Sequence, residues 1–328
     1  MYLFIICIAL LYFCSLFTKS NSAGFDKEKV VPLKAMLALL IILHHISLEN
    51  EIAWLSPLKS WGAPIVSIFF FISGYGLILS YDKCGEAYLS RFIKHRIINT
   101  LISPLLLASL IFWLIVPDLP GFVESVRLLI MDGVVLLPHS WYVFAILIFY
   151  IAFYISCKFM SGVNIIILLT SLCAGYIIIT NQLGYARCWY ISALAFPAGA
   201  AYAYWSRAFL NRISNNTWWV VPLCILFAAF LYFTHSELGY IFVYVLIPFS
   251  IVFLCSKLNI EKLGKIKLFR WLSTISYEIY LCQGIAMYLA SKIVFNGSLL
   301  YILCVLLLSF VFAYIVKETR VFILNKCH

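Results

Sequence analysis

Residues 33–45 read LKAMLALLIILHH, an apolar run with a lysine near its start and two histidines at its end. Its hydrophobicity predicts a membrane-spanning helix. Lys34 and His45 are eleven residues apart, so in an α-helix both side chains lie on one face, about 16 Å apart along the axis. His44 points roughly 80° away from that stripe. Because a histidine within a membrane is costly without a partner or a task, we expect Lys34 and His45 to act as a functional pair.

The composition describes a membrane protein. Of the 328 residues, 65% are hydrophobic and 11% are charged, and the mean hydropathy is +1.04. Soluble globular proteins have about a quarter of their residues charged, so this chain has no room for a sizeable water-soluble domain. The eleven cysteines are scattered in apolar runs without paired spacing. They indicate small buried side chains, neither a disulfide framework nor a metal site.

The apolar runs predict an all-α, polytopic bundle of ten core transmembrane helices plus one extra N-terminal helix. Residues 1–17 form the extra helix, because they lack the positive start of a secretory signal. Residues 30–320 form one membrane domain. Within it, 123–131 is predicted to be a short amphipathic surface helix. The core spans are expected near 33–48, 61–80, 97–116, 139–157, 163–180, 188–205, 217–234, 240–256, 272–291 and 298–316.

The distribution of Lys and Arg predicts the orientation of these spans. Placing Lys34 on the cytoplasmic side puts nineteen of the 23 basic residues there. The four on the outer side are Lys59, Arg127, Arg187 and Lys292. This asymmetry follows the positive-inside rule. It also explains the net charge of +10 without a nucleic-acid partner.

The Lys34–His45 stretch resembles the opening helix of the acyltransferase-3 family, multi-pass membrane enzymes that acylate glycans and other acceptors. Lys34 stands where that family more often has arginine, and Ala35 replaces a glycine. The next span contains FFFISGYGL, which is similar to the family's second-helix pattern. Its residues Ser73, Gly74 and Gly76 offer a small face for close helix packing. The alternative is a substrate wall that uses Ser73 or Tyr75.

Basic residues follow in the stretch 91–96, RFIKHR, ahead of a helix with Pro104. It resembles the family's R-x-x-x-R element. Such residues often only anchor a helix at the inner membrane surface. The alternative is that Arg91 and Arg96 join Lys34 in holding an anionic donor, because arginine binds phosphate well.

Aromatic residues mark the outer ends of two later spans. His139, Trp141 and Tyr142 open one of them, and Trp189 lies near the start of another, ahead of FPAG at 196–199. Both stretches resemble family patterns. Trp and Tyr at this depth commonly form an interfacial belt; the alternative is a flat platform for a sugar ring.

Residues 275–284, ISYEIYLCQG, resemble the family signature S-x-x-x-Y-x-x-H, with Gln283 where the family usually has histidine. Glu278 is the acidic residue placed inside a predicted span. Because an uncompensated carboxylate in a membrane is expensive, we expect it to meet a cation, His45 or a hydroxyl. Tyr280 is expected to line the same site.

The resemblance implies an enzyme of the inner (cytoplasmic) membrane that moves an acyl group, commonly acetyl, from acyl-CoA to a hydroxyl of a surface glycan or its lipid-linked precursor. Acetyl-CoA is a co-substrate, with no permanently bound cofactor and no metal. The head of the donor would bind Lys34, Arg91 and Arg96. His45 would act as general base or take the acyl group transiently, with Glu278 orienting it. The acceptor would enter past the following residues: Ser73, Tyr75, His139, Trp141, Tyr142, Trp189, Tyr280 and Gln283.

Two other functions stay open. The first is a glycan transporter, flippase or polymerase, although no internal repeat or set of midplane ion ligands favours it. The second is a sensor or interaction protein that keeps the fold without catalysis. The expected partners are membrane lipid, acyl-CoA and a glycan acceptor, and the sequence predicts no particular oligomeric state.

Overall fold

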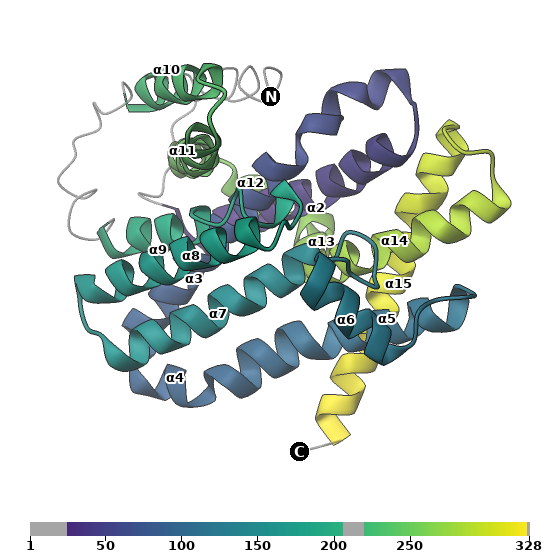
Figure 1. Ribbon diagram of the computed structural model, residues 1–328, viewed down its shortest axis with the longest axis horizontal. Helices are drawn as coiled ribbons and strands as arrows, with labels where there is room; N and C mark the ends of the chain where they lie inside the picture. Colours follow the sequence, from purple (N-terminus) through teal and green to yellow (C-terminus); the bar gives the residue numbers. More distant parts are fainter. Residues whose placement is uncertain (1–24, 206–219, 327–328) are drawn as a thin grey trace.

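The computed structural model describes residues 25–205 and 220–326, and every regular element within them is helical (Figure 1). Seven helical segments of this part are long and apolar enough to cross a membrane. The all-helical membrane fold is therefore confirmed, whereas the predicted count of ten core spans is not. The predicted helix at 1–17 lies outside the described residues. The seven segments are α2 (Lys27–Glu49), α3 (Gly62–Cys84), Glu86–Ile115, α7 (Trp141–Phe159), α8 (Val163–Gln182), α11 (Glu237–Lys257) and α15 (Leu299–Lys326).

The segment Glu86–Ile115 is one continuous helix that changes its winding. It consists of α4 (Glu86–Phe92), the π-helical η2 (Ile93–Ile102) and α5 (Ser103–Ile115). The span expected at 97–116 is thus the second half of a longer helix. Stretches of π-helix are rare and occur often at functional sites.

Two predicted spans are interrupted. Within 188–205, a short helix η3 (Arg187–Trp189) is followed by turns, and α9 begins only at Ala195 and is described to Trp205. Within 272–291, α13 (Lys267–Thr274) ends before Ile275, and α14 (Ser276–Ile293) begins after it. The break puts Glu278 in the first turn of α14, where the helix dipole favours a negative charge.

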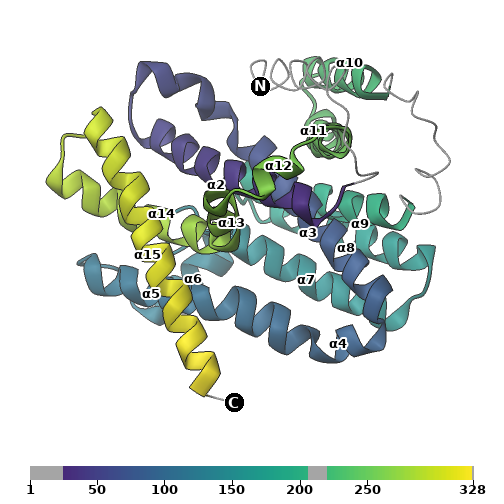
Figure 2. The same cartoon turned by 180° about the vertical axis from the view of Figure 1, so that it is seen from behind.

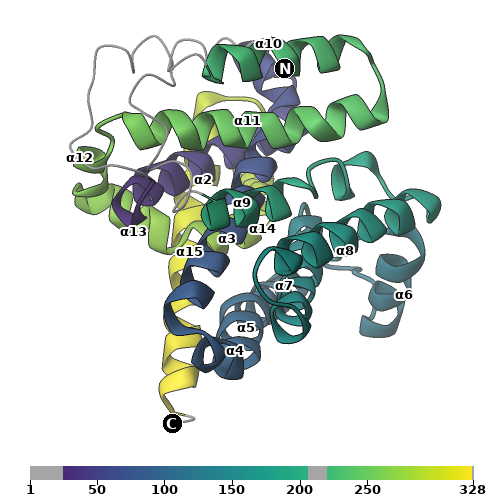
Figure 3. The ribbon, with the colours of Figure 1, turned by 90° about the vertical axis from the view of Figure 1, so that its left-hand side faces the viewer.

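The remaining elements are short. The surface helix expected at 123–131 is present as α6 (Phe122–Asp132). Helix α10 (Val220–Phe233) pairs with α11 along one edge of the bundle, as Figure 3 shows. The others are η1 (Ala53–Ser60) and α12 (Glu261–Gly264).

Polar contacts fix the N-terminal end of α2. Asp26 caps the helix by accepting a hydrogen bond from the backbone N–H of Lys29 (3.1 Å). The Lys29 side chain is fully buried, and its Nζ donates to the carbonyl of Ser256 at the end of α11 (2.8 Å) and lies 3.8 Å from Glu261. Together these contacts set the position of α2 relative to α11 and α12.

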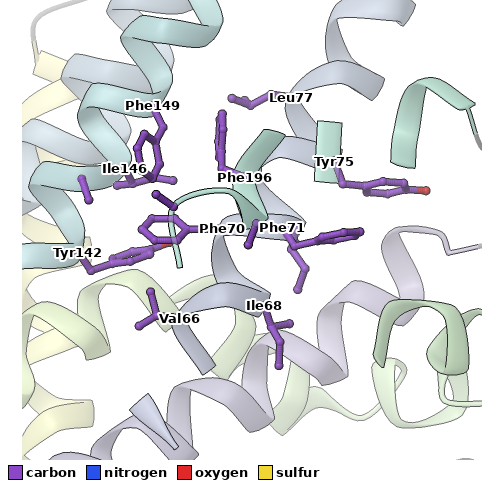
Figure 4. Close-up of a cluster of buried hydrophobic side chains, with 14 of the residues drawn as sticks. Val66, Ile68, Phe70, Phe71, Tyr75, Leu77, Tyr142, Ile146, Phe149 and Phe196 are labelled. Atoms are coloured by element: carbon purple, nitrogen blue, oxygen red, sulfur yellow. The ribbon is translucent and has the colours of Figure 1, made fainter. Parts of the chain in front are cut away.

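Helices α3 and α9 approach closely through glycines. A Cβ atom added at Gly74 would lie 2.0 Å from the carbonyl oxygen of Phe196, and one at Gly199 would lie 2.0 Å from that of Phe71. Gly76 faces open space. The small face predicted for α3 is therefore centred on Gly74. Aromatic side chains fill the core beside this contact, with Phe70, Tyr142, Phe149 and Phe196 grouped together in Figure 4.

Helices α14 and α15 form a hairpin, and both also contact α2 and α5 (Figure 2). This arrangement places the C-terminal part of the chain beside the helix that carries Lys34 and His45.

We expect Gly74→Ala to destabilise the fold because the new methyl group would meet a backbone carbonyl that cannot move aside. Overpacking of this kind lowers the free energy of unfolding by about 1–3 kcal/mol. Thermal melting of the purified protein in detergent measures the change. Gly76→Ala is the matched control on the same helix and should melt within a degree or two of the parent. Equal melting temperatures for the two variants would contradict the proposed contact.

Candidate functional site

Two polar clusters lie near opposite ends of α2. The basic cluster consists of Lys34, Arg96, Glu278, Lys317 and Arg320. The histidine cluster consists of His45, Glu49, His139, Tyr280 and Gln283. Helix α14 contributes to both, because Glu278 lies near Lys34 and Gln283 lies beside His45. Lys34 and His45 therefore both face α14.

The basic cluster surrounds one buried carboxylate. Glu278 is 2% exposed, and its Oε1 lies 3.2 Å from Nη1 of Arg320 on α15. Lys34 and Lys317 are close enough to interact with the same carboxylate, and Arg96 is close enough to repel Lys34. Three cations thus share one anion, and a fourth cation, Arg96, lies near Lys34. The excess positive charge makes this end of the bundle suited to a ligand with several negative charges.

Arg96 of this cluster lies in the π-helical η2. The Nε of Arg96 donates to the hydroxyl of Tyr88 (3.2 Å), and the guanidinium lies 5.9 Å from that ring. The hydroxyl of Tyr277 on α14 donates to the carbonyl of Leu101 in η2 (2.9 Å). Arg91 is exposed and has no ion pair or hydrogen bond within the described part of the chain. The structure therefore brings Arg96 to Lys34 and leaves Arg91 at the surface.

The histidine cluster is built on stacked imidazoles. His45 is 4% exposed, and its ring lies parallel to that of His139, with centroids 3.9 Å apart and an interplanar angle of 14°. The Nε2 of His139 lies 3.1 Å from Oε1 of Glu49. His44 belongs to the packing instead: its Nδ1 hydrogen-bonds the carbonyl of Leu58 (2.8 Å).

Helix α14 holds the segment that carries His139. The hydroxyl of Tyr280 donates to the carbonyl of His139. One turn later Gly284 packs against Pro138, where an added Cβ would lie 2.9 Å from the proline ring. His139 has φ +62°, which is unusual for a residue other than glycine. These contacts fix its backbone directly before α7 begins at Trp141.

Several buried polar atoms at this end have no hydrogen-bond partner among the described residues. They are Nδ1 of His45, both amide atoms of Gln283 and the hydroxyl of Ser140. The Gln283 amide lies beside the His45 ring without meeting good hydrogen-bond geometry. Because buried polar groups are normally satisfied, this group of atoms is suited to meet water or a polar ligand. No cluster of three or more His, Cys, Asp or Glu side chains suited to a metal ion occurs in 25–205 and 220–326.

The predicted aromatic residues divide between this site and the core. Tyr142 packs edge-on against Tyr280 (5.2 Å between centroids), and Trp141 lies 6.1 Å from Trp189. The Ser73 hydroxyl is within reach of Tyr142. Tyr75 lies on the other side of the aromatic cluster in Figure 4.

Tyr75 is therefore distant from the histidine cluster. Its hydroxyl donates to the carbonyl of Phe25, and its ring packs against Phe25 and Tyr202. These contacts tie α3 to the segment before α2 and to α9.

A further aromatic residue, Tyr185, packs beside Trp141 and Trp189. Tyr185 packs on Trp189 (5.2 Å), and its hydroxyl contacts the carbonyls of Leu129 and Ile130 at the end of α6. Burial holds the pKa of the Tyr185 phenol above its usual value, so it stays a hydrogen-bond donor. Helix α6 is thereby attached beside Trp141 and Trp189.

The comparison with family models decides the classification. The model described as an acyltransferase domain, that of acyltransferase-3, matches residues 33–318. The chain belongs to the acyltransferase-3 family. No curated protein and no solved structure shows significant similarity to it. As an acyltransferase-3 member, the protein is an acyltransferase with several membrane-spanning helices.

Sequence reasoning missed three residues of this acyltransferase's clusters. Glu49 follows His45 by four residues, so the two lie on the same helix face. Extending the predicted helix by one turn would have placed Glu49 next to His45. Lys317 and Arg320 are three residues apart and share a helix face, but the predicted last span ended at residue 316. In the structure α15 continues to Lys326, which brings both cations beside Glu278.

We expect Glu278→Gln to destabilise the protein because three cations would lose their shared anion. Breaking a buried ion pair costs about 3–5 kcal/mol. A polyanion that binds the same cations should then raise the melting temperature of the variant more than that of the parent. Melting with and without free coenzyme A measures both effects. Glu318→Gln, at an exposed position on α15, is the matched control; identical behaviour of the two variants would contradict the assignment.

Proposed function

We propose that this acyltransferase moves an acetyl or similar acyl group from acyl-CoA at the cytoplasmic side of the inner membrane to a hydroxyl of a cell-surface glycan or its lipid-linked precursor. The single observation that supports this most is the placement of the basic cluster and the buried His45 on the two ends of one helix face. Residues 34 and 45 are about 16 Å apart along α2. The donor would approach from one end and the acceptor from the other.

The basic cluster is the proposed donor site. Coenzyme A carries several phosphate charges on its nucleotide head, and arginine binds phosphate with two parallel hydrogen bonds. Lys34 and Arg96 are the proposed contacts, together with Lys317 and Arg320 that the structure adds. Arg91, exposed on the same helix, would attract the donor rather than hold it.

His45 is the proposed chemical centre. The pantetheine arm of the donor would follow the face of α2 that meets α14, so that the thioester comes near the imidazole. His45 then takes the proton from the acceptor hydroxyl as the new C–O bond forms and the C–S bond breaks, and the proton passes to the thiolate of the leaving coenzyme A. A transient acyl group on His45 is the alternative form of the same step.

The acceptor side is proposed at the opposite end. Trp141 offers an aromatic surface on which a sugar ring packs through its apolar C–H face, and the buried Trp189 supports it from 6.1 Å away. The unpartnered amide of Gln283 and hydroxyl of Ser140 supply hydrogen bonds for hydroxyl groups. Glu278 meets a cation, which is one of the partners expected for it: it pairs with Arg320. We propose that it organises the donor cations and does not orient His45.

We expect His45→Ala to lower acyl transfer by at least about 100-fold because the proton acceptor is lost. Membranes containing the protein are supplied with radiolabelled acetyl-CoA, and label in the glycan fraction is counted. His95→Ala, an exposed position in η2, should transfer at the parental rate. Transfer by His45→Ala at the parental rate would refute the mechanism, and no transfer by the parent protein would favour a transporter or flippase.

We expect Arg96→Gln to raise the KM for acetyl-CoA about tenfold with a smaller change in kcat, because one charge-assisted phosphate contact is worth about 1.5–3 kcal/mol. Lys94→Gln, an exposed neighbour, is the matched control. An unchanged KM for Arg96→Gln would place the nucleotide head elsewhere.

A further inference from the structure

His45 lacks the carboxylate that commonly orients a catalytic imidazole through its second ring nitrogen. Its Nδ1 has no hydrogen-bond partner in the described part of the chain. Glu278, the acid that sequence reasoning placed near it, pairs with Arg320 instead. Besides the Gln283 amide at its edge, the orientation of the His45 ring therefore depends on the groups packed against its faces.

Three rings surround the imidazole of His45. The ring centroid of His44 lies 5.0 Å away at 50°, and that of Tyr280 lies 6.2 Å away at 59°. Both are tilted and touch only an edge. The ring of His139 lies 3.9 Å away at 14° and covers a whole face. His139 is thus the neighbour that most restricts rotation of the His45 ring.

His139 is itself held at both its backbone and its ring. Its carbonyl accepts from Tyr280, and Pro138 before it rests on Gly284. Its Nε2 lies 3.1 Å from the carboxylate of Glu49. A left-handed residue other than glycine costs of order 1–3 kcal/mol unless its surroundings impose the conformation. These contacts impose it here, and the result is an imidazole aimed face-on at His45.

Resting on the acyl-transfer function above, we propose that Glu49 and His139 are positioning residues for His45. Glu49 fixes the ring of His139, and that ring holds His45 in the orientation that acyl transfer needs.

The exposed fractions of the Glu49 and His139 side chains distinguish a positioning role from a role in protein stability. Glu49 is 44% exposed and His139 is 22% exposed at their side chains. Exposed ion pairs contribute little to stability, with a median of about 0–1 kcal/mol. A displacement of a catalytic group by about 1 Å, in contrast, can lower the reaction rate about 100-fold. Loss of Glu49 is therefore expected to change kcat while the melting temperature stays almost the same.

Four variants test the pair. Glu49→Gln removes the charge, and Glu51→Gln, exposed two residues later, is the matched control. His139→Asn tolerates the left-handed backbone but removes the stacking ring. His139→Phe keeps a ring against His45 and removes the partner of Glu49. Each protein is assayed as whole chain in membranes, with radiolabelled acetyl-CoA as donor and endogenous glycan as acceptor, and each is melted in detergent.

We expect Glu49→Gln to lower kcat about tenfold relative to Glu51→Gln, with the KM for acetyl-CoA and the melting temperature unchanged. His139→Asn should lower kcat about 100-fold, and His139→Phe should retain more activity than His139→Asn. In the His139→Phe background, adding Glu49→Gln should have no further effect, because Glu49 acts through the imidazole.

Other results overturn the proposal. If the parent transfers label and Glu49→Gln matches Glu51→Gln in kcat, Glu49 positions nothing, while the acyl-transfer function stands. If His139→Phe is no more active than His139→Asn, stacking on His45 is not what His139 provides. If the parent protein transfers no label, the proposed function itself falls, and the positioning of His45 falls with it.

Discussion

The burial of charged groups and imidazoles between α2 and α14 is the constraint on which the rest of this structure depends. In a membrane, each such group needs a partner within the protein, because no water is available to solvate it. Glu278 finds Arg320, and His45 finds the face of His139. Helix α14 can serve both ends only because it begins at Ser276, after the break that separates it from α13. The position of that break thus sets the position of both clusters.

The sequence predicted the membrane class, the small face on α3 and the stripe on α2, because each depends on residues close together in the chain. It did not predict the partner of Glu278. A carboxylate inside a span has to meet some donor or cation, but the sequence does not say which one. The partner is Arg320, which tertiary packing of α15 places beside Glu278. The turns between η3 and α9 and the π-helical winding of η2 were missed for a similar reason: hydrophobicity measures apolar length and is blind to the winding of the backbone.

The family match and the geometry carry different parts of the functional argument. The match over residues 33–318 establishes an acyltransferase-3 member, but it does not say which side chains meet. The structure adds that Arg96, Lys317 and Arg320 gather near Lys34, and that Arg91 does not. A cluster of four cations and one carboxylate suits a donor head with several phosphates, because positive charge is left over after the internal pairing.

The two ends of α2 solve the problem of a buried titratable group in opposite ways. At the basic end, the charge of Glu278 is balanced by a direct ion pair with Arg320. This pair holds the carboxylate in place and occupies the oxygen that faces the guanidinium. At the histidine end, His45 keeps Nδ1 without a protein partner and is held by stacking. A ring held by its face can leave Nδ1 without a hydrogen bond, as in His45, whereas a ring oriented by a carboxylate commits that nitrogen. The carboxylate at this end, Glu49, accordingly meets His139 and not His45, so Nδ1 of His45 stays open to a ligand.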